Sequence, residues 1–196
     1  MNYADIVYFD TGNSHGISTT LFVSGCDMRC KNCHNPQAQD FSYGKPFTEK
    51  EENEIIESLK NPHVRYFVLS GGQPSSDENK ETCIKLIRRI KKEVPGIEII
   101  LYTGHKVNEI DCRFLLHCEY VIDGEYKEEY AVEGLDLRGS YNQSCWEKLS
   151  VDRTSNEVNP IKLNFVLINR YDYFKSRGDG ESKELMLYLT DLELNE

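Results

Sequence analysis

The chain has 196 residues, a length that suits one domain with enough interior to bury a hydrophobic core. Its 33 acidic residues outnumber 23 basic ones, and the net charge of −10 excludes nucleic-acid binding through a general basic surface. We find no apolar run of about 18 residues and no N-terminal signal pattern, so we expect no membrane span and a cytoplasmic protein. Seven cysteines are many for the cytoplasm, where thiols stay reduced and clustered cysteines usually bind metals or catalyse.

Strand-like and helix-like segments alternate as far as about residue 124. Apolar runs that end at glycine or turn residues predict strands at 19–25, 64–72, 97–104 and 119–124. Apolar residues at helical spacing predict helices at 48–61, 76–94 and 107–118. In the first helix, Thr48 is the predicted N-cap and Glu51 completes a capping box. This order predicts βαβ units, a parallel sheet and an α/β fold.

The pattern changes near residue 146. Residues 146–160 are polar and rich in turn residues, and 161–168 and 184–194 are apolar runs. These runs are predicted to be two edge strands, or a strand and a short helix. We therefore divide the chain into a main domain, residues 1–145, and a C-terminal extension, residues 146–196, which packs on it.

Unusual residues follow each predicted strand at its carboxyl end. They form the cysteine-rich segment after residue 25, "SGGQP" (70–74), "YTGHK" (102–106) and "IDGEY" (122–126). In parallel α/β folds the active site lies at this edge of the sheet. We therefore expect the four segments to meet there.

Three cysteines within eight positions, Cys26, Cys30 and Cys33, form the strongest candidate site. Thiolates are soft ligands that select zinc, copper(I) or iron–sulfur clusters. A [4Fe–4S] cluster held by three cysteines leaves one iron open to a small molecule. The alternative is a structural zinc ion with His34 or a further cysteine as fourth ligand, although adjacent residues such as Cys33 and His34 rarely reach one metal.

The other four cysteines carry weaker predictions. Cys83 falls on the inner face of the second predicted helix, where a free cysteine usually packs in the core. A second metal site built from Cys112, Cys118 and Cys145 is a less favoured alternative.

The spacing Cys-x3-Cys-x2-Cys resembles the signature of the radical S-adenosylmethionine (SAM) enzymes. "SGGQP" resembles their second motif, Gly-Gly-(Asp/Glu)-Pro, whose backbone meets the SAM amino group. The blocks "NYADIVYFD", "LFVSGC", "LSGGQP", "YTGHK" and "VIDGEY…LDLRGSYNQ" resemble, in order, the motifs of the anaerobic ribonucleoside-triphosphate reductase activating proteins. The resemblance covers residues 1 to about 145.

The resemblance implies a partial (βα) barrel of the radical SAM type with mainly parallel strands. It implies that Cys26, Cys30 and Cys33 hold a [4Fe–4S] cluster whose open iron binds SAM. The residues expected around this cofactor pair are Asn32, Cys33, His34, Gly71, Gly72 and Gln73. The implied reaction is reductive cleavage of SAM, which generates a glycyl radical on the reductase and requires no acid–base residue.

The same resemblance implies the partners. They are the anaerobic reductase and a flavodoxin- or ferredoxin-like electron donor, and the family also suggests a homodimer. A small activator cannot enclose its substrate, so we expect the open side of the barrel to bind the reductase. "RGSYNQ" (138–143) and the tail are the candidates for that face.

Three positions depart from the family's pattern. Gln73 stands where an acidic residue is usual, so a charge pairing with the SAM ammonium would be weakened. The family's early motif Asn-Gly-Pro-Gly appears here as "NSHG" (13–16). His34 stands where tyrosine is common in the family. Two other functions stay open: a small-molecule radical SAM enzyme of the carboxy-deazaguanine synthase type, which "RGSYNQ" does not support, and a non-enzymatic zinc-binding module.

Overall fold

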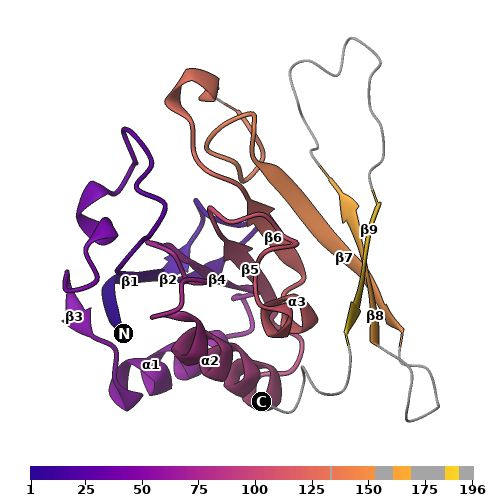
Figure 1. Cartoon of the computed structure of the whole chain (residues 1–196). Coiled ribbons are helices and arrows are strands. Elements are labelled where there is room, and N and C mark those ends of the chain that lie inside the picture. The colour runs from indigo at the N-terminus through magenta and orange to yellow at the C-terminus, as the bar shows by residue number, and fades with distance from the viewer. Residues whose placement is uncertain (133, 153–160, 169–183, 190–196) are drawn as a thin grey trace.

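A computed structural model describes residues 1–132, 134–152, 161–168 and 184–189. Its strands form one sheet in the order β3-β1-β2-β4-β5-β6-β7-β8-β9. They are β1 (Asn2–Asp10), β2 (Ser18–Val23), β3 (Lys45–Pro46), β4 (Tyr66–Gly71), β5 (Glu98–Tyr102), β6 (Tyr120–Asp123), β7 (Ser144–Asp152), β8 (Ile161–Leu167) and β9 (Glu184–Leu189). The helices α1 (Glu49–Leu59), α2 (Lys80–Glu93) and α3 (Cys112–His117) lie together below the sheet in Figure 1.

The centre of the sheet is parallel and its flanks are antiparallel. The four strands predicted from the sequence, β2, β4, β5 and β6, pair in parallel, which confirms the βαβ prediction. The five outer pairings are antiparallel, so the prediction of mainly parallel strands is wrong for the sheet as a whole. A parallel pair needs a crossover, usually a helix, whereas β1 returns into β2 through a short connection at residues 11–17.

The main core lies between the helices and the sheet. The inner face of α1 buries Ile55, Ile56 and Leu59, and α2 buries Cys83 with four aliphatic residues, so the core role predicted for Cys83 is confirmed. The predicted capping box of α1 is present, since Thr48 and Glu51 exchange backbone and side-chain hydrogen bonds. Helix α3 begins later than predicted because Asp111 acts as its N-cap and accepts a hydrogen bond from the Arg113 N–H.

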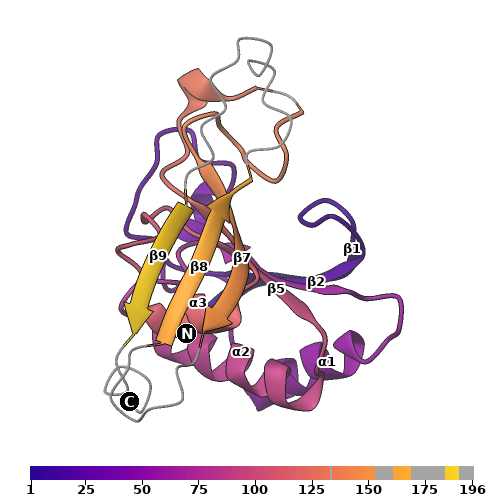
Figure 2. The same ribbon diagram turned by 90° about the vertical axis from the view of Figure 1, so that its right-hand side faces the viewer.

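The C-terminal strands continue the same sheet. β7 pairs with β6 and spans the predicted boundary at residues 145 and 146. Figure 2 shows β7, β8 and β9 side by side. On β8, Leu163 and Phe165 are almost fully buried in the main core. Both apolar runs form strands, β8 and β9, so the alternative of two strands is the one that the structure has. Residues 190–194 of the second run lie outside the described residues. The division into two domains stays a prediction.

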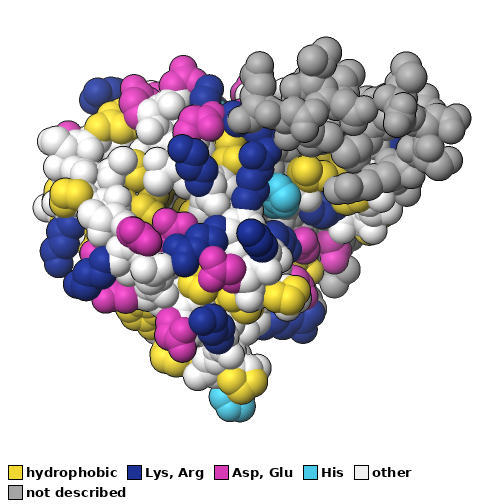
Figure 3. All heavy atoms as spheres, turned by 90° about the horizontal axis from the view of Figure 1, so that it is seen from below, with side chains coloured by type: hydrophobic (Ala, Val, Ile, Leu, Met, Phe, Trp, Pro, Cys, Tyr) yellow, Lys and Arg dark blue, Asp and Glu magenta, His cyan; other side chains and the backbone are white. Residues whose placement is uncertain are grey.

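The helix side of the molecule carries mixed charge. In Figure 3, Lys and Arg side chains are interspersed with Asp and Glu over this face. Arg89 of α2, for example, contacts Glu52 of α1 at 3.2 Å and Glu93 at 2.7 Å. Within the described ranges, none of the helices has the length and apolar character needed to cross a membrane.

Candidate metal centre

The carboxyl ends of the four parallel strands meet at one edge of the sheet, as predicted. The segment after β4 bonds directly to the segment after β2, because the Gln73 N–H donates to Gly25 O at 2.7 Å. The segment after β5 bonds to the segment after β4, since the Gly104 N–H donates to Gln73 Oε1 at 3.2 Å. The segment after β6 joins them through the Gly124 N–H, which donates to His105 O at 3.3 Å.

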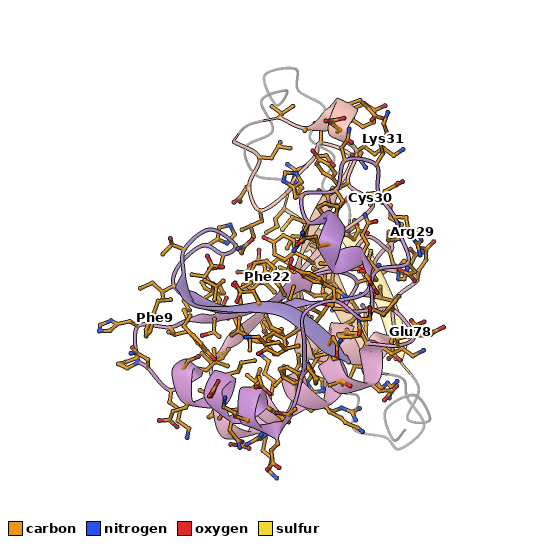
Figure 4. The ribbon with its side chains drawn as sticks, turned by 90° about the vertical axis from the view of Figure 1, so that its left-hand side faces the viewer. Phe9, Phe22, Arg29, Cys30, Lys31 and Glu78 are labelled. Atoms are coloured by element: carbon orange, nitrogen blue, oxygen red, sulfur yellow. The ribbon has the colours of Figure 1, made fainter. Side chains whose placement is uncertain are left out.

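The cysteine loop, defined here as residues 24–35, follows β2. Gly25 has φ 92°, and a Cβ there would lie 1.9 Å from the ring of Phe41, so only glycine suits this position. Arg29 and Asn32 also have left-handed backbone conformations, with φ 47° and 54°. These turns fold the loop tightly, and Figure 4 shows Arg29, Cys30 and Lys31 close together on it, far from Phe9.

The three cysteines of this loop are free and partly buried. The Cys26 sulfur accepts hydrogen bonds from the Met28 and Arg29 N–H groups, and the Cys30 sulfur accepts one from the Tyr126 N–H. Burial raises the pKa of both thiols, and these N–H groups oppose that shift because they stabilise the thiolate. Cys30 is close enough to interact electrostatically with both Cys26 and Cys33.

The donor set can be compared with the needs of a single ion and of a cluster. Among the described residues, no three His, Cys, Asp or Glu side chains lie close enough together to hold one metal ion. A zinc ion needs every thiolate at about 2.3 Å from one point. In a [4Fe–4S] cluster each cysteine binds a different iron, so the three sulfurs stay further apart. Three free thiols on one loop are soft ligands of the kind that such a cluster takes.

The paired glycines after β4 serve the packing of two segments. Gly71 has φ 98°, and a Cβ there would lie 2.6 Å from Val23 O. At Gly72 a Cβ would lie 2.3 Å from Gly25 O. Both contacts are with backbone, which cannot move aside cheaply, so the glycines let the β4 segment lie against the cysteine loop. Their contact with SAM stays a prediction.

Gln73 is fully buried beside these glycines. Its Oε1 accepts the Gly104 N–H, whereas its Nε2 has no hydrogen-bond partner among the described residues. The neighbouring Asn79 donates through Nδ2 to Ser24 O at 3.0 Å and to Gln73 O at 3.1 Å. A buried N–H without a partner costs free energy, so the Gln73 amide is suited to an additional acceptor.

The other two predicted cofactor residues contact a neighbouring segment. The Asn32 amide donates to Glu128 Oε2, and the His34 ring meets the Tyr126 ring edge-on, with 4.6 Å between centroids. Both side chains are exposed. They connect the cysteine loop to the segment after β6, and no described contact joins them to Gly71 or Gly72.

The "RGSYNQ" motif forms an internally bonded loop. Gln143 Oε1 accepts from the Gly139 and Ser140 N–H groups at 2.9 and 3.0 Å, and Gln143 Nε2 donates to Gly124 O at 2.9 Å. Arg138 and Ser140 are buried, whereas Tyr141 is 44% exposed. Most of this motif therefore holds the segment after β6 in place, and Tyr141 is its large exposed side chain.

Sequence reasoning missed several residues that join the segments of this edge. Asn79, Asp27 and Ser75 carry no motif signal of their own, and His105 is not among the predicted site residues. The available signal for His105 was its position in "YTGHK", directly after a parallel strand. Its contacts link the cysteine loop to β4 and β5.

Comparison with known proteins decides the family. Residues 12–146 match a family model described as a 4Fe-4S single cluster domain. The chain is 38% identical over 148 residues to the anaerobic ribonucleoside-triphosphate reductase-activating protein of Haemophilus influenzae, an alignment that covers 73% of this chain and 96% of that protein. The chain belongs to the family of the anaerobic ribonucleoside-triphosphate reductase-activating proteins. The family predicted from the motifs is therefore confirmed.

Other members of the activating-protein family match at similar levels. The Vibrio cholerae activating protein is 37% identical over 148 residues, with 73% of this chain and 96% of that protein covered. The activating protein of Enterobacteria phage T4 is 32% identical over 147 residues, with 74% and 94% covered. The 4Fe-4S model supports the predicted iron–sulfur cluster, and it ends at residue 146, before β8 and β9.

Proposed function

We propose that this activating protein uses a [4Fe–4S] cluster to cleave SAM reductively and generates a glycyl radical on an anaerobic (class III) ribonucleotide reductase. One observation carries the proposal: three free thiols lie on a single loop, and the Gly-Gly-Gln segment is bonded directly to that loop. The names of the relatives supply the acceptor protein. This activity would make the protein an oxidoreductase of the radical SAM type.

In this proposal Cys26, Cys30 and Cys33 hold the cluster. A bound cluster supplies the single electron that the cleavage of SAM requires. The chain contributes the backbone N–H groups of Met28, Arg29 and Tyr126, whose hydrogen bonds to the cysteine sulfurs favour the thiolate form that a metal binds.

The SAM site is proposed at the junction of the cysteine loop and the β4 segment. The proposed contacts are Asn32, Cys33, His34, Gly71, Gly72 and Gln73. The Gln73 side chain supports this location, because it is fully buried beside the paired glycines and its amide is only partly engaged by described residues. A partial barrel of the radical SAM type, with its open side opposite the helices, is part of the same proposal.

The proposed partners are the anaerobic reductase and a flavodoxin- or ferredoxin-like electron donor, in the cytoplasm, and a homodimer is the proposed assembly. The connection between β6 and β7 offers a surface for the reductase, since Tyr130 and Tyr141 are 47% and 44% exposed there. This connection also contacts the cysteine loop through the Tyr126 N–H and Glu128. A docked reductase would therefore lie next to the proposed reaction centre.

Spectroscopy of the anaerobically reconstituted protein tests this function. We expect a brown protein with a thiolate-to-iron absorption band and, after dithionite, an EPR signal that shifts when SAM is added. A triple Cys→Ala variant at positions 26, 30 and 33 is the control and should remain colourless. A wild-type protein that binds zinc and stays colourless would support the zinc-module alternative. An EPR signal that shifts when SAM is added, without radical transfer to a reductase, would favour the small-molecule radical SAM enzyme.

A further inference from the structure

A chain of polar side chains connects the cysteine loop to the ends of β4 and β5. His105 Nε2 lies 3.3 Å from Asp27 Oδ2, and Asp27 directly follows Cys26. On the other side of the ring, His105 Nδ1 lies 3.2 Å from Ser75 Oγ. Ser75 Oγ lies 2.9 Å from Thr103 Oγ1, which accepts the His105 backbone N–H at 3.1 Å.

When the His105 ring is neutral, donor and acceptor rules give this hydrogen-bond network one direction. An ionised carboxylate only accepts hydrogen bonds, so an attractive contact with Asp27 requires the proton on His105 Nε2. In the neutral ring Nδ1 is then an acceptor, which the Ser75 hydroxyl satisfies by donating to it. The Ser75 oxygen in turn accepts from the Thr103 hydroxyl. Every polar hydrogen of this four-residue network thus has one acceptor.

This hydrogen-bond network is buried at one end and exposed at the other. Ser75 and Thr103 are 8% and 5% exposed, so their positions are set by the ends of β4 and β5. The His105 side chain is 26% exposed and that of Asp27 is 46% exposed. The network therefore runs from a fixed, buried end at the sheet to the exposed beginning of the cysteine loop.

We propose that His105 is a positioning residue that fastens the cysteine loop to the ends of β4 and β5 through Asp27. A second contact at the same place assists it, because a Cβ at Gly104 would lie 2.6 Å from Met28 Cγ, so the β5 segment lies directly against the loop. Restraining the loop keeps Cys26 near the sheet edge before any cluster is bound. The effect on a bound cluster rests on the proposed function, whereas the effect on the loop does not.

Hydrogen exchange of the full metal-free chain tests the restraint directly. In His105→Phe and in Asp27→Asn we expect the amides of residues 26–35 to exchange about threefold to fivefold faster than in the wild type, as for loss of one partly exposed polar contact. The double variant should exchange no faster than either single variant, because both remove the same contact. His63→Phe is the control, since His63 is exposed on the connection between α1 and β4.

Two further readouts separate this inference from the proposed function. In the wild type, ¹⁵N NMR of the His105 ring should show the tautomer protonated at Nε2. In reconstituted protein, a chelator should remove iron faster from both variants than from the His63→Phe control. If the wild type binds no cluster, the proposed function fails and the exchange test still stands. Unchanged exchange in Asp27→Asn would overturn the role of His105. A neutral ring that carries its proton on Nδ1 and none on Nε2 would overturn it as well.

Discussion

A side chain at position 72 would collide with the backbone of the cysteine loop. We expect Gly72→Ala to lower the free energy of unfolding by about 1–3 kcal/mol, because its Cβ would lie 2.3 Å from Gly25 O and 2.8 Å from Ala38 O. Gly12→Ala is the matched control, since its nearest neighbour is Asp10 Oδ1 at 3.5 Å. Urea unfolding of both variants measures the difference, and equal stabilities would contradict the close packing of the two segments.

Gln73 allows a second prediction at the scale of one residue. In Gln73→Glu the introduced carboxyl is fully buried, and burial raises its pKa above that of the unfolded chain. The destabilisation should therefore be small near pH 5 and should grow to about 1–3 kcal/mol as the pH rises through the raised pKa.

Bound SAM should offset this cost, because its ammonium group pairs with the carboxylate. We expect Gln73→Glu to bind SAM more tightly than the wild type at pH 8 and to gain more thermal stability from it. Isothermal calorimetry and melting curves, each with and without SAM, provide the two readouts. Weaker binding of SAM by the variant would place the cofactor elsewhere.

At the scale of elements, the sequence predicted what local rules determine. The capping box at Thr48 and Glu51 and the apolar stripe of α1 are local signals, and the structure has both. Strand β1 was not predicted as an element, because "NYADIVYFD" mixes apolar and acidic residues and is only partly buried. Strand β7 was read as a polar, turn-rich segment because its pairing with β6 is decided by tertiary contacts.

The connection between β6 and β7 combines an anchoring residue and an exposed one. Gln143→Ala removes four hydrogen bonds of the "RGSYNQ" loop and should lower the free energy of unfolding by about 1–3 kcal/mol. Tyr141→Ala should change stability less, by about 0.5 kcal/mol, because the residue is 44% exposed.

Tyr141 should matter more for binding of the reductase than for stability. We expect Tyr141→Ala to weaken radical transfer to the reductase while SAM cleavage without the reductase is unchanged. Measuring both reactions over a range of reductase concentrations separates docking from chemistry. Wild-type radical transfer by Tyr141→Ala would remove this residue from the docking surface.

For the whole molecule, the sequence predicted the parallel centre of the sheet and the edge at which the cysteine, glycine and histidine segments meet. These features follow from strand–helix alternation and from the rule that parallel strands share a carboxyl edge. The contacts between loops, such as those of His105 and Asn79, join residues far apart in the chain and were beyond local patterns. The antiparallel flanks were missed for the same reason.

Burial of β8 residues predicts that the C-terminal extension stabilises the main domain. Phe165 is 1% exposed, so Phe165→Ala should cost about 3–5 kcal/mol. Met186→Ala on β9 is the matched control, with a side chain that is 51% exposed and an expected change within about 0.5 kcal/mol. Similar unfolding curves for the two variants would show that the extension contributes little to the core.

The measurement that tests the central claim most directly is EPR of an anaerobic ribonucleoside-triphosphate reductase mixed with the reconstituted protein, SAM and a reductant. We expect a glycyl radical on the reductase that is absent when SAM is omitted and absent with the Cys26→Ala, Cys30→Ala or Cys33→Ala variant. The Haemophilus influenzae activating protein with its own reductase is the positive control. No radical on any tested reductase, from a protein with an intact cluster that cleaves SAM, would contradict the account.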